Sequence, residues 1–335
     1  MARRVALRRR ATVAVGLAAL TAGIVLAIQM LPGGRGARTI RDSPRSSVVG
    51  QSVAAVRFPA PKALHPFGNA TPDEGRWRRA GRLVRGHPAV YETTIGLPDN
   101  PAVLAGVAWM DTKLLRARLY SGSLSPGGLF WRYTAPVSPA LARTLVAAFN
   151  GGFLLNVSGG GYLSEGHLVA PLRVGAASLV IYADGSSTVG EWGRDASMSP
   201  RVVAVRQNLT LLVDHGRPVP GLNPADYSAW GYSLGKIANQ WRSGLGVTAD
   251  GALVYVAGQM NIVDLAKVLA RAGAVHAMTL DMNPLWTVFA TYAPAGANGV
   301  ASASNGTDLL PTMYQTPARF FQPTYSRDFV TMSAR

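Results

Sequence analysis

The sequence predicts an α+β protein with a mixed, largely antiparallel sheet and interspersed helices, preceded by one N-terminal transmembrane helix. Three observations support this prediction. Hydrophobic residues make up 48% of the 335 residues, which is enough to bury a sizeable core. Short apolar runs alternate with glycine, Asp-Gly and proline turns, a pattern typical of antiparallel strands. One uncharged run, residues 11–31, is long enough to cross a bilayer.

The expected strands are short runs rich in β-branched and aromatic residues. Two Asp-Gly pairs, Asp184-Gly185 and Asp250-Gly251, are typical of two-residue hairpin turns and indicate strand pairs around them. A glycine-rich stretch, 121–128, separates the first strands from the rest. We expect strands at 90–95, 103–110, 114–120, 178–183, 188–192, 246–248, 252–256 and 277–280.

Two helices have clear start signals. Ser138 followed by Pro139 offers a side-chain cap and a first-turn proline, and predicts a helix through Leu145. Asn261 opens a second helix, with Asp264 three positions later. Its apolar face consists of Ile262, Leu265, Val268 and Leu269, and Gly273 closes it.

The N-terminal quarter of the sequence predicts a membrane tether. Five arginines within residues 1–10 precede the run 11–31, whose 21 residues span about 30 Å as a helix. Because arginine-rich flanks stay in the cytoplasm, we expect 1–10 to be cytoplasmic and 11–31 to be an uncleaved single-pass anchor. The Arg/Pro-rich stretch 32–88 reads as a linker. We expect one extracytoplasmic domain, 89–335, to follow this linker. The composition of the chain is typical of a bacterial protein.

The net charge of +16 is concentrated at the N-terminus. Residues 1–90 contain 16 basic and 3 acidic residues, whereas residues 91–335 contain 17 and 14. Because the globular part is nearly neutral, the sequence does not predict a nucleic-acid partner.

The residue inventory excludes several kinds of site. The chain has no cysteine, which rules out disulfides, thiolate metal sites and cysteine nucleophiles. Its five histidines are never within four residues of one another, so no helical histidine pair for zinc can be drawn. We therefore expect no metal and no cofactor.

Two junctions between strand and loop carry the best candidate chemistry. Phe149 leads into Asn150-Gly151-Gly152, where main-chain N–H groups and an amide can hold an anion, although a plain tight turn has the same composition. Leu280 leads into Asp281, and a carboxylate directly after a buried strand is held rigidly at the end of a sheet. A capping aspartate is the ordinary structural reading of that position.

Several motifs in order resemble the phosphodiester glycosidase family. They are FNGGF (149–153), RQNLTLLVDHGRPV (206–219), WRSGLGVTADG (241–251), NIVDLA (261–266) and AMTLD (277–281), and the resemblance spans about 90–335. Members of that family cleave the bond between a sugar's anomeric carbon and a phosphodiester. The resemblance implies a hydrolase with a carbohydrate phosphodiester substrate, and we expect that substrate in cell-envelope glycan.

The resemblance also implies site residues. Asn150, Gly151 and Gly152 match the Asn-Gly-Gly loop, Arg242 matches the arginine, and Asp281 matches the aspartate of an L-D-G-G-G-S motif. An arginine fork suits phosphate oxygens, and Asp281 can activate water or stabilise positive charge at the anomeric carbon. In this chain, Met282-Asn283-Pro284-Leu285-Trp286 stands in place of the glycines and serine.

A second carboxylate and several further side chains complete the candidate site. Glu165 follows the glycines 159–161 and is the second catalytic candidate, although a solvated hairpin glutamate has the same pattern. Asn283 is a candidate for substrate binding. Three tryptophans can offer apolar faces to a sugar, or pack in the core: Trp230, Trp241 and Trp286.

Two other functions remain open at this point. Gly231-Tyr232-Ser233-Leu234-Gly235 matches the G-x-S-x-G motif of serine esterases, but the residues before it contain Pro224 and read as a loop, not as the strand that a nucleophile elbow needs. The altered sequence after Asp281 is also compatible with a non-catalytic glycan-binding module of the same fold.

Overall fold

The computed structural model describes residues 56–68, 71–128, 131–226, 229–231, 237–296 and 298–335. Contacts divide the chain into two units, 1–52 and 53–335. The predicted cytoplasmic segment and transmembrane anchor lie outside the described residues. Within the described part, no helix is long and apolar enough to span a membrane.

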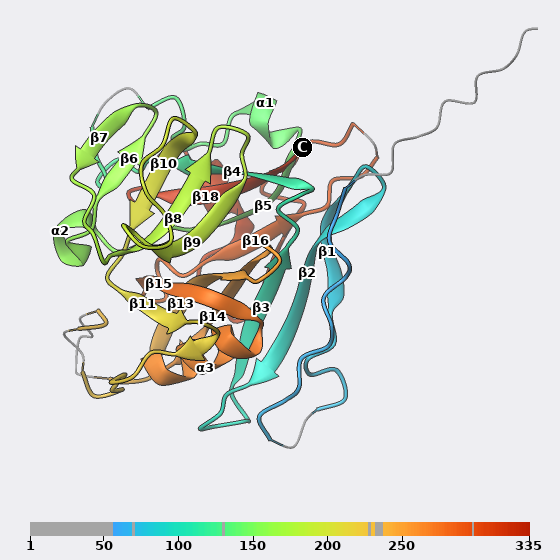
Figure 1. Ribbon diagram of the computed structural model, residues 1–335. Helices are drawn as coiled ribbons and strands as arrows, with labels where there is room; N and C mark the ends of the chain where they lie inside the picture. The colour runs from blue at the N-terminus through green and yellow to red at the C-terminus, as the bar shows by residue number, and fades with distance from the viewer. Residues whose placement is uncertain (1–55, 69–70, 129–130, 227–228, 232–236, 297) are drawn as a thin grey trace, which may run out of the picture. The chain divides into compact units, whose positions relative to one another are not determined.

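The larger unit is built on an eight-stranded antiparallel sheet with the order β1-β2-β3-β14-β13-β15-β11-β12 (Figure 1). One half of the sheet consists of β1 (Arg78–Val84), β2 (His87–Gly96), β3 (Leu104–Met110) and β14 (Leu253–Met260). The other half consists of β13 (Gln240–Thr248), β15 (Ala274–Met282), β11 (Leu211–Asp214) and β12 (Arg217–Pro218). Helix α3 (Ile262–Arg271) packs on β11, β13, β14 and β15.

Two five-stranded sheets complete the unit. The first has the order β7-β6-β10-β8-β9 and consists of β6 (Tyr162–Ser164), β7 (His167–Ala170), β8 (Ala177–Tyr182), β9 (Ser187–Glu191) and β10 (Val202–Gln207). The second has the order β17-β16-β5-β18-β4 and consists of β4 (Leu115–Tyr120), β5 (Leu145–Asn150), β16 (Phe289–Tyr292), β17 (Gly306–Asp308) and β18 (Phe329–Ala334). Three short helical segments are α1 (Pro139–Ala142), α2 (Leu155–Ser158) and η2 (Pro317–Phe321).

The prediction of largely antiparallel strands is confirmed, and the helices of the described residues are few. Every strand pair of the described residues is antiparallel. The expected cap of α3 is present, because Asn261 Oδ1 accepts hydrogen bonds from the N–H groups of Val263 and Asp264, each 2.9 Å long. The apolar face of α3 is buried, as its spacing predicts.

Two regions differ from the sequence predictions. The helix that starts after Ser138 ends at Ala142, and Leu145, predicted as its end, begins strand β5. The apolar run 145–149 fits between β16 and β18, where its side chains are fully buried. Residues 78–84, within the stretch read as a linker, form β1 at the edge of the large sheet, and Phe58 N–H donates to Asp111 Oδ2 over 2.9 Å.

Candidate functional site

The Asp281 carboxylate lies near the carboxyl end of β15 and is 3% exposed. The Asp281 N–H donates to the Gly151 carbonyl over 3.0 Å, so the structure brings the two predicted junctions together. Oδ1 of Asp281 accepts from the N–H of Met282 over 2.9 Å. Among the described residues Oδ2 has no hydrogen-bond partner, and Arg327 Nη1 lies 3.7 Å from it. Within the described part of the chain, this oxygen therefore has unused hydrogen-bonding capacity.

Burial raises the pKa of Asp281 to about 7. The Arg327 guanidinium and the Met282 N–H oppose this shift, and the neighbouring Asp328 carboxylate adds to it. A carboxyl group with such a pKa can gain or lose a proton near neutral pH, which general acid–base catalysis requires.

Asp281 opens into a cavity of about 400 Å³. The walls of this cavity come from the segment after β5, the start of β13, the turn after β15, and Arg327. Trp286 lies in this wall, and the Arg327 guanidinium stacks over its ring at 4.7 Å from the centroid. The lining residues are Phe153, Leu154, Val157, Gly231, Gln240, Asp281, Met282, Asn283, Pro284, Leu285, Trp286 and Arg327.

Asn150 supports the Asp281 backbone from inside the protein. Its side-chain amide donates to Gly151 O and to Ser243 Oγ, both over 2.9 Å. Its oxygen accepts from Tyr255 OH (2.7 Å) and from Val288 N–H (3.1 Å). These four hydrogen bonds use the whole capacity of the amide. Since Ser243 Oγ donates to the Asp281 carbonyl over 2.7 Å, the structure gives the Asn150 amide a positioning role and leaves it no group for substrate.

The double glycine exists because a buried ion pair lies against it. Arg206 and Asp328 are joined over 2.8 Å with side chains at most 1% exposed. A Cβ atom at Gly151 would lie 2.1 Å from Asp328 Oδ2, and one at Gly152 would lie 3.0 Å from Arg206 Cζ. The Gly151 N–H already donates to the Asp328 carbonyl over 2.9 Å. The absence of side chains therefore serves this close approach, and the Gly151 N–H is not free for an anion.

Arg242 is a buried arginine without a carboxylate partner among the described residues. It is 2% exposed, and Nη1 donates to the Trp230 carbonyl over 2.8 Å and lies 3.8 Å from Met282 Sδ. Its Nε has no hydrogen-bond partner in the part of the chain that the structure describes, and burial lowers the pKa of Arg242 to about 10. Because Met282 and Gly231 line the cavity, this cation lies directly behind the cavity wall.

The structure does not bring Glu165 to Asp281. Glu165 and Gly166 form the two-residue turn of the β6–β7 hairpin, with φ of 52° and 80°. Both carboxylate oxygens accept main-chain N–H groups, from Arg132 and Tyr133, each over 2.9 Å. Glu165 lines a different cavity, between β4 and the first five-stranded sheet. The candidate second carboxylate is therefore outside the Asp281 site.

The remaining candidates have mixed placements. Asn283 lines the Asp281 cavity with φ of 93°, and its Oδ1 accepts from Leu285 N–H over 2.9 Å, which makes it a turn residue of the wall. Trp230 and Trp241 are partly buried against the core, and Trp286 alone of the three lines the cavity. Ser233 lies outside the described residues. Among the described residues, no cluster of three histidine or acidic side chains could hold a metal ion.

Sequence reasoning missed Arg327 and the Arg206–Asp328 pair. Arg206 stands inside one of the motifs, and Arg327-Asp328 directly precede the last apolar strand. A charged pair at the start of a buried strand is the signal that could have singled them out. What the sequence could not supply was the pairing of residues more than a hundred positions apart.

The solved structures that are similar in part include the following three. The zebrafish N-acetylglucosamine-1-phosphodiester alpha-N-acetylglucosaminidase catalytic domain, auto-inhibited by its pro-peptide, is 17% identical over 78% of this chain and 88% of that chain, with a TM-score of 0.43. A Synechocystis protein is 11% identical over 75% and 63% (TM-score 0.39). An exported protein from Burkholderia pseudomallei is 15% identical over 69% and 74% (TM-score 0.38).

The family comparison is more specific. No curated protein matches the chain. The model of the phosphodiester glycosidase family matches residues 143–281, a range that starts just before β5 and ends at Asp281. The resemblance to phosphodiester glycosidases that the sequence motifs predict is therefore confirmed over residues 143–281.

Proposed function

We propose that this chain hydrolyses a sugar-1-phosphodiester in the cavity at the end of β15. One observation carries the proposal: the buried Asp281 carboxylate, at the end of the segment that matches the family, lines a cavity beside the Arg327 cation, and one of its oxygens has no hydrogen-bond partner among the described residues. An acid–base group and an anion-binding group at one cavity are the minimum that this reaction needs.

The reaction assigns a role to each group. The bond between the anomeric carbon and the phosphodiester oxygen breaks, and its electron pair leaves with the phosphate. Because a phosphate is a weak base, the leaving group needs little protonation, so binding of the anion and stabilisation of the cationic sugar dominate. Asp281 Oδ2 accepts the proton of the attacking water, which forms the new bond to the anomeric carbon. Arg327 binds the phosphate, and Trp286 offers a ring edge to the sugar.

Arg242 and Asn150 act behind this first layer of contacts. The Arg242 charge, without a carboxylate partner among the described residues, adds positive potential behind the cavity and favours an anionic substrate. The Asn150 amide donates a hydrogen bond to Ser243 Oγ, which in turn donates to the Asp281 carbonyl. Both residues therefore support the reaction by charge and by position, and Arg327 takes the direct contact.

The test is a hydrolysis screen of the full chain against glycosyl-1-phosphodiesters of cell-envelope sugars, with carboxylic esters as the control. The full chain is needed, because a start at residue 89 would remove β1 and the first residues of β2 from the large sheet. Turnover of the phosphodiesters supports the proposal. Turnover of esters alone would favour the serine at position 233, and binding without turnover would favour a glycan-binding module.

We also propose that residues 11–31 anchor the protein in the cell membrane, with the hydrolase domain outside the cytoplasm. The support is the arginine-rich start and the uncharged run of 21 residues. Protease treatment of intact spheroplasts should cut the domain without lysis. Cleavage only after lysis would place the domain in the cytoplasm, and would leave the chemistry of the Asp281 site unaffected.

A further inference from the structure

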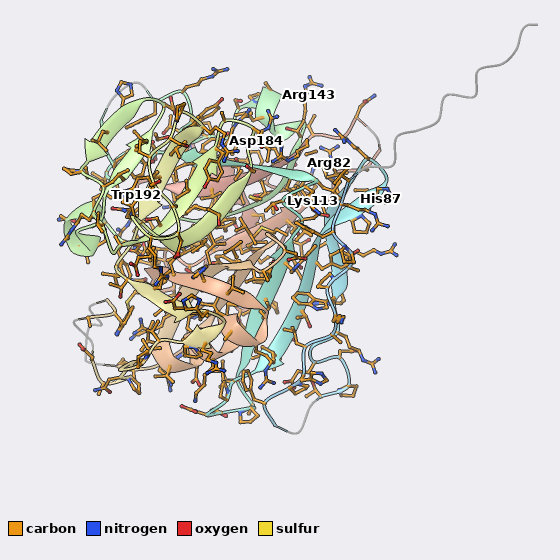
Figure 2. The ribbon with its side chains drawn as sticks, in the orientation of Figure 1. Arg82, His87, Lys113, Arg143, Asp184 and Trp192 are labelled. Atoms are coloured by element: carbon orange, nitrogen blue, oxygen red, sulfur yellow. The ribbon has the colours of Figure 1, made fainter. Side chains whose placement is uncertain are left out.

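A second cavity, of about 600 Å³, lies between β4 and the first five-stranded sheet. Its walls come from β4, from the β6–β7 and β8–β9 turns, and from the start of β10. Asp184, labelled in Figure 2, belongs to the turn at its rim, next to the lining residue Gly185. Its size is that of a small-molecule site. The proposed hydrolysis makes no use of it.

The floor of this cavity is apolar. Ile181 and Ala204 are at most 5% exposed and belong to the main core. At the mouth, Met198 and Val203 line the cavity with 54% and 42% of their surface exposed. An aliphatic chain laid across these side chains would remove both its own surface and theirs from water.

Two cations stand beside the apolar floor. Arg116 and Arg118 of β4 line the cavity, and neither has an ion-pair partner in the described part of the chain. The Arg118 guanidinium lies over the Tyr133 ring at 4.9 Å from its centroid. Glu165, a carboxylate of the wall, uses both oxygens to accept main-chain N–H groups. The charge of the wall therefore favours an anion.

One further main-chain N–H of β4 also faces this side. Residues of an antiparallel strand direct their N–H and C=O groups alternately toward and away from the neighbouring strand. On the side away from β18, the N–H of Ala117 donates to Gly185 O (2.9 Å) and that of Ser121 donates to Tyr133 O (2.8 Å). Leu119 lies between them and directs its N–H to the same side.

Leu119 is only 3% exposed and lines the cavity, so its N–H lies in the cavity wall. A main-chain N–H in a cavity wall can donate a hydrogen bond to a ligand oxygen. Because the Gly185 and Tyr133 carbonyls close the strand edge on both sides, the opening is too short for an added peptide strand. It fits a single acceptor group.

We propose that this cavity binds a monomeric long-chain carboxylate, a fatty acid. The carboxylate would lie between the Leu119 N–H and the two arginines, which can bind both of its oxygens. The chain would lie along Ile181 toward Val203. A sugar fits less well, because the wall offers few polar side chains and Arg118 covers a face of Tyr133.

Photo-cross-linking of the full-length protein tests this site. The probe is a fatty acid with a diazirine in its chain, used below its micelle concentration, and mass spectrometry maps the labelled peptides. Labels should fall on β6, β8 and β10. Dodecanoate should compete, whereas dodecanol should compete at least about tenfold more weakly, because it lacks the charge that the arginines bind. Butyrate should not compete, because it lacks the apolar chain.

Two variants and one control separate the cavity from nonspecific adsorption. Arg118→Gln should raise the half-competing concentration of dodecanoate about tenfold or more. Arg132→Gln is the control, since Arg132 also lies over Tyr133, at 5.4 Å, but does not line the cavity. Val203→Trp fills the mouth at an exposed strand position and should abolish labelling there. Equal competition by dodecanol, equal loss in both arginine variants, or labelling that survives Val203→Trp would overturn the proposal.

Discussion

The two cavities offer a comparison between two carboxylates. Asp281 and Glu165 each line a cavity; Asp281 lies near the carboxyl end of β15, and Glu165 directly follows β6. Both oxygens of Glu165 accept main-chain hydrogen bonds, whereas one oxygen of buried Asp281 accepts none. The difference shows that a place in a cavity wall does not by itself make a carboxylate suitable for catalysis. The carboxylate also needs an oxygen that the protein's own hydrogen bonds leave unoccupied.

Removal of the Asp281 charge should have the largest effect. Asp281→Asn preserves shape and the hydrogen bond to Met282 N–H, but loses the proton acceptor. We expect phosphodiester turnover to fall by about 10²-fold or more, as for the loss of a positioned acid–base group. Steady-state kinetics with a glycosyl phosphodiester that the unmodified protein hydrolyses measure this fall.

Glu92 provides a matched control for that variant. It is also buried, and burial raises its pKa to about 7, but it lies on β2 and accepts from Thr291 Oγ1 over 3.3 Å, away from the lining of the Asp281 cavity. Glu92→Gln should keep the rate. A full rate in Asp281→Asn, or an equal loss in Glu92→Gln, would remove Asp281 from catalysis.

Arg327 should contribute mainly to substrate binding. Arg327→Gln removes a charged donor to phosphate, and we expect KM to rise about 10-fold to 100-fold. Because Arg327 lowers the pKa of Asp281, its loss should also move the acidic limb of the rate profile from near pH 7 to higher pH. Arg319→Gln is the comparison, since Arg319 lies over Trp286 at 5.7 Å but does not line the cavity. An unshifted profile with unchanged KM contradicts this role.

Arg242 should have a smaller effect, because it lies behind the wall. Arg242→Lys keeps the charge but loses the forked geometry that reaches the Trp230 carbonyl. We expect kcat/KM to fall about tenfold, equivalent to about 1.4 kcal/mol. Inhibition by inorganic phosphate should weaken in parallel. Unchanged values of both would mark Arg242 as a packing residue only.

The pH dependence of stability tests the same burial. The folded-state pKa of Asp281, about 7, is above its unfolded value near 3.9, so the folded protein holds the proton more tightly between these two values. The free energy of unfolding from this group therefore falls as pH rises from about 4 to 7. In Asp281→Asn this part of the fall should disappear, which urea titrations at pH 5 and pH 8 can measure. An equally steep fall in the variant would show that Asp281 has an ordinary pKa.

The sequence predicts local features well. The Asn261 cap, the apolar face of α3 and the hairpin around Asp184-Gly185 each depend on residues a few positions apart, and each is present. The start signal at Ser138 is also real, since its Oγ accepts from Leu141 N–H over 3.4 Å. The predicted helix nevertheless stops after one turn, because the apolar run 145–149 pairs with β16 and β18 as a strand inside a sheet.

The chemistry of the site depends on distant contacts, which local patterns do not reveal. Asn150 fits the motif of a ligand-binding amide, yet Tyr255 and Ser243, about a hundred positions away, occupy it. Arg327 reaches Asp281 only because β18 packs beside β5. The position of Asp281 could be predicted from its motif, whereas its unpaired oxygen could be seen only in the folded chain.

Replacement of Glu165 should have the smallest effect on the rate, and it tests most directly whether the two carboxylates differ in role. Glu165→Gln keeps one oxygen acceptor but loses the charge that holds the N–H groups of Arg132 and Tyr133. We expect a loss of about 1 kcal/mol in the free energy of unfolding, as for a capping side chain, with an unchanged kcat. Because this turn also borders the second cavity, the fatty-acid competition measures whether its wall is preserved. A turnover loss comparable with that of Asp281→Asn, at unchanged stability, would mean that the two carboxylates act together after all.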